Sequence, residues 1–260
     1  MANYLRERSA GEILRGTIKI YLQNFLQLCG MYLLPTFPFL MLKLKVMGNR
    51  HAGYFYFLWI TMWALVTPFA TAMLTVGVSD ICVGNPPNII RSLRWVVGTI
   101  LGKLVLTNLF MFVIMIAAFI PWILTVYLPR VPSFFPWLTF LGATILILLF
   151  LVWWMFVPTV VVLERTVGCT ALKRSRVLGK GFYIRNCGVV LLLYLPSLIL
   201  GWLIFGTLQI SDNDILRMLG VALEGALAPV VLIATVLLYY ELRVRSEGYD
   251  LTMLGQDLKR

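Results

Sequence analysis

Long stretches without charge, separated by short basic segments, are the dominant pattern along this chain. A helix needs roughly 20 apolar residues to cross the hydrocarbon layer of a bilayer, and each stretch reaches that length. The pattern therefore predicts an all-α integral membrane protein with six transmembrane helices. The predicted spans cover residues 20–42, 52–79, 104–129, 131–163, 186–211 and 218–240.

The basic residues fall mainly on one side of the predicted membrane. If the N-terminus lies inside the cell, the segments on that side hold 17 of the 22 lysines and arginines, and the opposite loops hold five. Lysine and arginine are enriched in the cytoplasmic loops of membrane proteins. The distribution therefore predicts that both termini lie in the cytoplasm.

Two of the basic segments have the period of an amphipathic helix. In the first, the apolar residues at 13, 14, 18, 21, 22 and 25 share one predicted face, and Arg15 and Lys19 lie opposite them. In the second, the apolar residues at 89, 90, 93, 96, 97 and 100 oppose Arg91 and Arg94. An apolar stripe beside a basic face is typical of a helix that lies in the headgroup layer.

The third basic segment, CTALKRSRVLGKGFYIRN from Cys169, carries more charge but has a weaker helical pattern, because Gly179 and Gly181 disfavour a helix. Two further arginines follow the last span. The residues expected to contact lipid headgroups or a partner are Arg15, Lys19, Arg91, Arg94, Lys173, Arg174, Arg176, Arg243 and Arg245.

A short motif recurs at the ends of the second, fourth and sixth predicted spans. An acid is followed three positions later by valine, starting at Asp80, Glu164 and Glu241. Together with prolines at matching offsets in the spans, the motif predicts three repeated units, each a basic interfacial helix followed by a hairpin of two spans. The predicted units are residues 8–80, 86–164 and 169–241, followed by a cytoplasmic tail at 242–260.

Composition supports the membrane interpretation. Apolar residues make up 60% of the chain and charged residues 13%, and the mean hydropathy is +0.90. A soluble domain of 260 residues cannot bury that much apolar surface in its core. The net charge of +11 lies in short segments beside the spans, which favours anionic lipid headgroups over nucleic acid as partners. We also expect protein partners in the membrane.

Residues for catalysis or cofactor binding are scarce. His51 is the single histidine and lies in a predicted external loop, so it cannot form a metal cluster or a catalytic diad with another histidine. No phosphate-binding glycine loop, nucleophile elbow or zinc-protease motif is present. Glu164 and Glu241 each have a basic neighbour and are interpreted as paired residues at span ends. The sequence thus predicts no enzyme and no cofactor.

Two stretches resemble a bacterial membrane-protein family. They are ERTVGCTALKRSRVL from Glu164 and LLYYELRVRSEGYDL from Leu237, and the family includes the membrane domain attached to some glycerophosphoryl diester phosphodiesterases. The resemblance implies a free-standing membrane domain, because the phosphodiesterase reaction of that family belongs to a separate soluble barrel. In the second stretch, Tyr239 and Tyr240 are expected at headgroup level, with Gly248 allowing a turn after the helix.

Two functions remain open from the sequence. The first is a non-catalytic scaffold or accessory subunit of an assembly in the cytoplasmic membrane of a bacterium. The alternative is a transporter or a lipid or solute permease, with Glu224 and the Pro229 kink on the pathway, because an ionisable residue within a span is a functional candidate. Both glutamate and proline also have an ordinary structural interpretation in a packed helix bundle.

Overall fold

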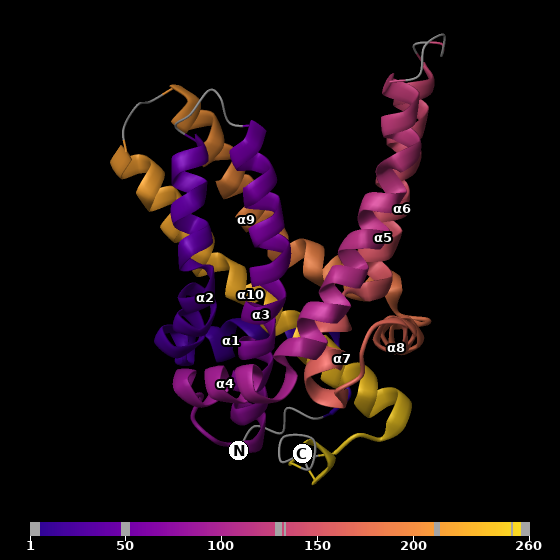
Figure 1. The fold of residues 1–260 in the computed structure, drawn as a ribbon. Helices are drawn as coiled ribbons and strands as arrows, with labels where there is room; N and C mark the ends of the chain where they lie inside the picture. The colour runs from indigo at the N-terminus through magenta and orange to yellow at the C-terminus, as the bar shows by residue number, and fades with distance from the viewer. Residues whose placement is uncertain are drawn as a thin grey trace.

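The computed structural model describes residues 6–47, 53–127, 132, 134–210, 214–250 and 252–255. Within these ranges all regular secondary structure is helical, and the main elements are ten α-helices and one short π-helix (Figure 1). The α-helices are α1 (Ala10–Gln23), α2 (Phe25–Met47), α3 (Gly53–Val83), α4 (Ile89–Trp95), α5 (Leu101–Tyr127), α6 (Phe135–Trp154), α7 (Val157–Glu164), α8 (Cys169–Gly179), α9 (Tyr183–Ile210) and α10 (Asp214–Glu247), and the π-helix is η1 (Val96–Ile100).

Several helices are long and apolar enough to cross a membrane. Among the described residues, five stretches meet that condition, and a sixth does if α8 and the first half of α9 count as one broken span. These two helices meet at a bend of 98°. The prediction of a helical membrane protein is therefore confirmed in outline, with five to six long apolar helices.

The long helices form three hairpins of two helices, α2–α3, α5–α6 and α9–α10. In Figure 1 the first and third hairpins lie together, whereas α5–α6 rises away from them on the other side of the molecule. The α10 helix contacts α1, α2, α3, α8 and α9, which makes it the central helix of the fold.

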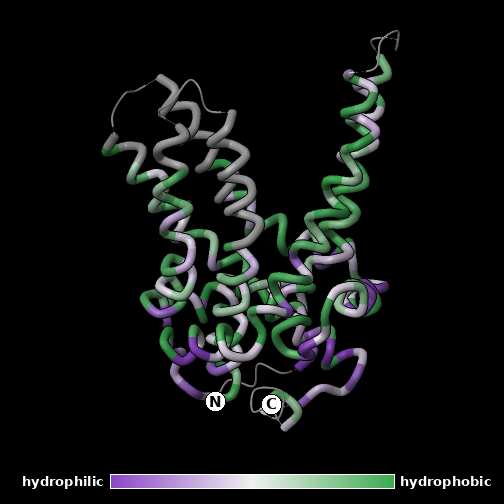
Figure 2. Tube along the Cα trace, in the orientation of Figure 1, coloured by the Kyte–Doolittle hydropathy of each residue, from purple (hydrophilic) through white to green (hydrophobic). Residues whose placement is uncertain are grey.

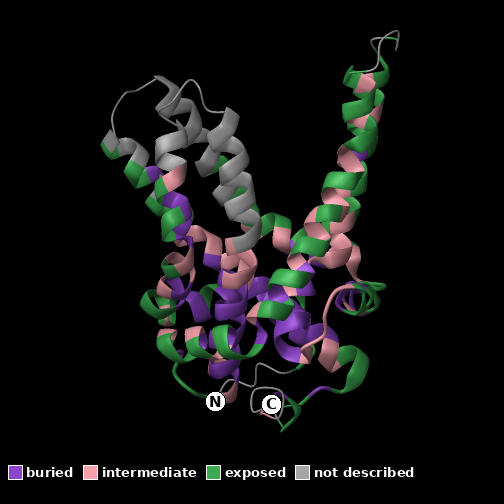
Figure 3. Cartoon of the chain, viewed as in Figure 1, coloured by how far each residue is buried: buried purple, intermediate pink, exposed green. Residues whose placement is uncertain are grey.

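One end of the molecule, which we call the base, holds α1, α4, α7 and α8, the last turns of α10 and both termini (Figure 1). Figure 2 shows that the hydrophilic residues gather at this end, and Figure 3 shows that most buried residues lie there too. The core is built from residues 70–80 of α3, 159–163 of α7 and 233–242 of α10, all of which are buried. The fold thus has its tightest packing at one end of the apolar helices.

The three basic segments all form helices at the base, as α1, α4 and α8. The structure divides the predicted apolar faces of α1 and α4 into a buried part and an exposed part. Inward-facing Ile13, Thr17, Ile20 and Tyr21 of α1 are buried, whereas Ile18 is 48% exposed. The apolar residues predicted for one face of α1 therefore form two neighbouring stripes. The stripe with Ile13 and Tyr21 packs on the protein core, and the stripe with Ile18 is exposed.

The same division occurs in α4. Val96 and Ile100 are buried, while Ile90 is 68% and Val97 50% exposed, on the side that also carries Arg94. Figure 1 shows α4 lying across the base and α5 rising from its end. The π-helix η1 connects the two, and π turns inside helices are a recognised cause of sharp bends.

The helix α10 runs past the predicted end of the sixth span at residue 240 and ends at Glu247. Gly248 then turns the chain with a φ of +64°, as the sequence indicated, because glycine adopts this conformation without strain. Tyr249 and Leu254 are buried, so the segment predicted as a tail packs back on the core. Tyr239 and Tyr240 were wrongly expected at the headgroups, since both are 0% exposed within the base.

Candidate functional site: a charge network at the base

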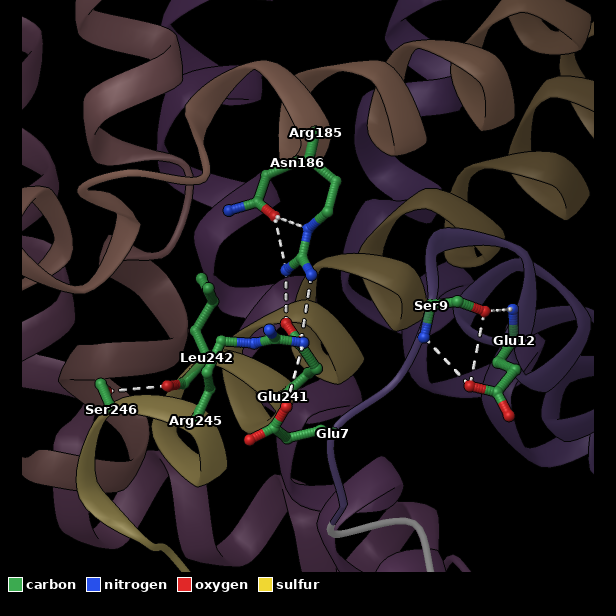
Figure 4. A network of polar contacts seen from close by, with 9 residues as sticks. All are labelled: Glu7, Ser9, Glu12, Arg185, Asn186, Glu241, Leu242, Arg245 and Ser246. Atoms are coloured by element: carbon green, nitrogen blue, oxygen red, sulfur yellow. Dashed lines mark hydrogen bonds and ion pairs between the residues drawn. The ribbon is translucent and has the colours of Figure 1, made fainter.

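The carboxylate of Glu241 is the centre of the first part of the network (Figure 4). Its side chain is 1% exposed, and it accepts two hydrogen bonds from the guanidinium of Arg185, at the start of α9. Arg245, one turn later on α10, donates to the same carboxylate at 2.9 and 2.6 Å. Arg245 also lies 3.5 Å from Glu7. This cluster links the N-terminal segment, α9 and α10 through charge-assisted hydrogen bonds, which are stronger than neutral ones.

A second cluster surrounds Glu164, the last residue of α7. Arg174 of α8 donates from Nε to both carboxylate oxygens of Glu164, at 2.9 and 2.8 Å, and its Nη2 pairs with Glu247 of α10. Arg243 bonds Glu247 at 2.9 Å, and the hydroxyl of Tyr239 donates to Glu164 at 2.9 Å. Three helices are joined here, and the two acids balance the two arginines.

These residues all belong to the two stretches that carry the family resemblance. Glu164 and Arg174 come from the first stretch, and Tyr239, Arg243 and Glu247 come from the second. The structure therefore brings the two stretches into direct contact, although about 65 residues separate Arg174 from Tyr239 along the sequence. The sequence alone gave no signal that one stretch binds the other.

The third span-end acid, Asp80, is also buried, with a 1% exposed side chain, and lies 3.5 Å from Arg91 of α4. Asp80 and Glu164 thus each pair with an arginine of the basic helix that follows them. Glu241 differs, because its arginines are Arg185 of α9, which precedes it in the chain, and Arg245 of its own helix. The sequence interpretation of Glu164 and Glu241 as paired residues at span ends agrees with this geometry.

Tyrosine rings fill the space between the charged groups. Tyr240 lies 2.5 Å from the hydroxyl of Ser79 on α3, and its ring stacks on that of Tyr249 with centroids 6.2 Å apart. The guanidinium of Arg243 lies 3.8 Å from the centre of the Tyr249 ring, within the range of a cation–π contact. The chain after Gly248 is held in place by these contacts.

The nine predicted headgroup cations fall into two groups. Arg174, Arg243 and Arg245 use their guanidinium groups in the ion pairs above, and Arg91 approaches Asp80. Arg176 lies over the ring of Trp153, 4.2 Å from its centre. The other four are exposed and have no ion pair within the part of the chain that the structure describes. They are Arg15, Lys19, Arg94 and Lys173.

The two candidate transport residues have different outcomes. The side chain of Glu224 lies outside the described residues. Pro229 is buried inside α10, where it has no N–H to donate to the carbonyl of Gly225 in the preceding turn. The hydroxyl of Tyr21 on α1 donates to the carbonyl of Ala226 in that turn.

A hollow of about 390 Å³ lies where the α5–α6 hairpin diverges from α3. Its wall is mostly apolar, with Met111 and Met115 of α5 and Trp154 of α6 among the lining residues, and Thr67 of α3 and Asn108 of α5 add polar groups. No local pattern in the sequence indicates this hollow, because its walls come from four helices.

The arrangement is suited to holding helices together rather than to activating a reactive group. Each buried carboxylate lies beside an arginine, so the network is close to neutral. Within the described ranges, no three His, Cys, Asp or Glu side chains lie close enough to hold a metal ion. Comparisons with known protein families, curated proteins and solved structures found no match for this chain.

Proposed function

We propose that this chain is a non-catalytic, multi-pass protein of the bacterial cytoplasmic membrane that serves as a scaffold or accessory subunit of a membrane assembly. The observation that carries the proposal is the contrast between a base locked by a neutral charge network and a hairpin held away from the bundle. A fixed base and a projecting hairpin are the parts that a scaffold needs.

The hollow beside α3 is the part of the hairpin best suited to a partner, which we take to be a transmembrane helix of another protein. Methionine side chains adapt to different shapes, and a polar side chain such as that of Thr67 can form a hydrogen bond between helices within a membrane. A lipid chain could use only the apolar part of this wall.

Site-directed photocrosslinking in native membranes tests this proposal. A photoreactive amino acid replaces Met115 or Ile147, which line the hollow, and Val113 or Leu148, which are 61% and 56% exposed, serve as matched controls on the same hairpin. We expect one protein adduct of constant mass from the hollow positions, and a fall in the amount of that protein when this chain is deleted. Lipid adducts alone, or equal adducts from all four positions, would contradict the proposal.

We also infer that both termini lie in the cytoplasm. The excess of basic residues in the segments assigned to that side supports this orientation. A reporter that is active only outside the cytoplasm should work at positions 50, 130 and 213 and stay silent at positions 85, 180 and 255. The reverse pattern would overturn the orientation.

The three-unit repeat remains part of the proposal. It is supported by the three hairpins, by the basic helices at the base, and by the pairing of Asp80 and Glu164 with arginines of the following helix. We also propose that the chain belongs to the phosphodiesterase membrane-domain family, on the resemblance of the stretches that begin at Glu164 and Leu237. An experimental structure in which the three hairpins fail to superpose would remove the repeat.

Transport through Glu224 and Pro229 is the alternative. The bond from Tyr21 to Ala226 favours a structural kink, because it ties this turn of α10 to α1 and occupies the carbonyl next to the one that Pro229 leaves without a donor. Glu224→Gln in proteoliposomes separates the two, since loss of proton or cation flux with intact assembly would support transport. We expect no difference in flux.

A further inference from the structure

The elbow between α4 and α5 combines a groove, exposed positive charge and exposed apolar side chains. A groove of about 550 Å³ opens there, lined by Asn88, Ile90, Arg91, Arg94, Trp95 and Thr99. It contains two guanidinium groups beside an indole ring and exposed apolar carbon. We propose that this groove binds the phosphate group of an anionic membrane phospholipid.

Positive charge in and beside the groove exceeds negative charge. Arg94 is exposed and unpaired in the described part of the chain, and the Arg91 side chain is 57% exposed with Asp80 as its only close acid there. The guanidinium of Arg165 lies 5.6 Å from the centre of the Trp95 ring and adds positive charge beside the groove, but its Nε and Nη2 are buried, so the donors for a phosphate are those of Arg91 and Arg94. Arginines present planar donors that match phosphate oxygens.

The apolar surroundings identify the anion as part of a lipid. Ile90 and Val97 are 68% and 50% exposed on the side of α4 that carries Arg94. A groove for a soluble anion would leave these side chains in water, whereas in the headgroup layer they enter the acyl region while the arginines reach the phosphates.

The path of the chain supports the same assignment. The helix α5 rises from the elbow, and its outward residues Val105, Leu106 and Leu109 are 37%, 59% and 45% exposed. A lipid with its phosphate at Arg94 would therefore lay its acyl chains along α5. The site goes further than the general headgroup contact of the basic helices, because it has a defined groove and defined donors.

Titration of the purified protein in neutral detergent with phosphatidylglycerol, followed by native mass spectrometry, tests the site. Arg94→Gln should weaken binding about tenfold, because it removes a charge-assisted contact without leaving a buried acid unpaired. Lys19→Gln is the matched control, since Lys19 is an equally unpaired, exposed cation on α1, and it should change binding less than twofold. Arg94→Lys should restore part of the affinity.

A second variant removes the space and leaves the charge unchanged. Thr99→Trp fills one wall of the groove and should also weaken binding, whereas melting temperatures should match the original protein for every variant. Equal losses of phosphatidylglycerol affinity in Arg94→Gln and Lys19→Gln would mean that the lipid binds through general attraction to basic residues, and this result would overturn the site. Equal binding of phosphatidylcholine would also overturn it, as would displacement of the lipid by inorganic phosphate at a similar concentration.

Discussion

The helices α6 and α7 are neighbours along the chain and equally free of charge until Glu164, yet their surroundings differ completely. In the twenty residues of α6 only Ala143 is buried, whereas six of the eight residues of α7 are buried. The helix α6 belongs to the projecting hairpin, and α7 belongs to the base. An apolar sequence therefore does not indicate whether lipid or protein surrounds it, because both accept apolar side chains equally well.

The difference lies in the polar groups near each helix. The base collects Asp80, Glu164 and Glu241 together with their arginines, and these groups tie the helix ends to one another. On the described part of the α5–α6 hairpin, a hydrogen bond joins the two helices through the hydroxyls of Thr125 and Thr139, at 2.8 Å. Charged pairs thus organise the end of the bundle, while the hairpin relies on close packing and a neutral hydrogen bond.

Breaking the Glu241 cluster should have the largest effect on stability. Glu241→Ala leaves Arg185 and Arg245 without their shared carboxylate, and we expect a loss of about 3–4 kcal/mol in the free energy of unfolding. Breaking a buried ion pair costs about 3–5 kcal/mol, and we expect a value at the lower end because both arginines are partly exposed and can be hydrated in the variant. Unfolding in mixed micelles measures the loss, and Arg15→Ala, at an exposed position without an ion pair in the described part of the chain, serves as control. A loss as small as that of the control would refute the importance of this cluster.

Truncating one leucine in each region compares the two directly. Leu237 of α10 is 2% exposed and Leu148 of α6 is 56% exposed. Leu237→Ala should cost about 2–3 kcal/mol because it leaves a cavity in the base, whereas Leu148→Ala should cost less than about 1 kcal/mol because lipid fills the space. The same micelle assay measures both changes. Equal losses in the free energy of unfolding would contradict the comparison, because they would mean that protein packs against Leu148 as tightly as against Leu237.

Removing a single hydroxyl from the second cluster should have a smaller effect. The Tyr239 hydroxyl donates to Glu164 at 2.9 Å and accepts from Arg243 at 3.3 Å. Tyr239→Phe should therefore reduce the free energy of unfolding by about 1–2 kcal/mol. Tyr127→Phe, at an 82% exposed position on the hairpin, should stay within about 0.5 kcal/mol of the original protein. If both changes had the same effect, the hydroxyl would not join α7 to α10.

Acid should weaken the start of α1 only slightly. The backbone N–H of Ser9 donates to Glu12, and with the nearby Arg6 it holds the pKa of Glu12 below its ordinary value of 4.5. The stabilisation is complete above pH 4.5 and is lost as the pH falls through the lowered pKa. The difference in Tm between the original protein and Glu12→Gln should therefore be present at neutral pH and disappear in acid. A difference independent of pH would contradict this account.

The sequence by itself determined the helical membrane class and the positions of the long helices. Uncharged runs of sufficient length have few structural solutions in a membrane, since every backbone polar group must be paired within the helix. It also indicated that α1, α4 and α8 would be helical and basic, and that Gly248 would turn the chain. These features depend on neighbours along the sequence, which a local pattern reports directly.

The tertiary structure decided which apolar faces meet protein and which stay exposed. Tyr239 and Tyr240 have the sequence signature of interfacial aromatic residues, but they are buried because α10 is surrounded by other helices at the base. Similarly, nothing local to Glu164 indicates that Arg174, Tyr239 and Arg243 will gather around it. Contacts between residues far apart in the chain depend on how the helices pack, and the hydrophobic pattern is the same for several packings.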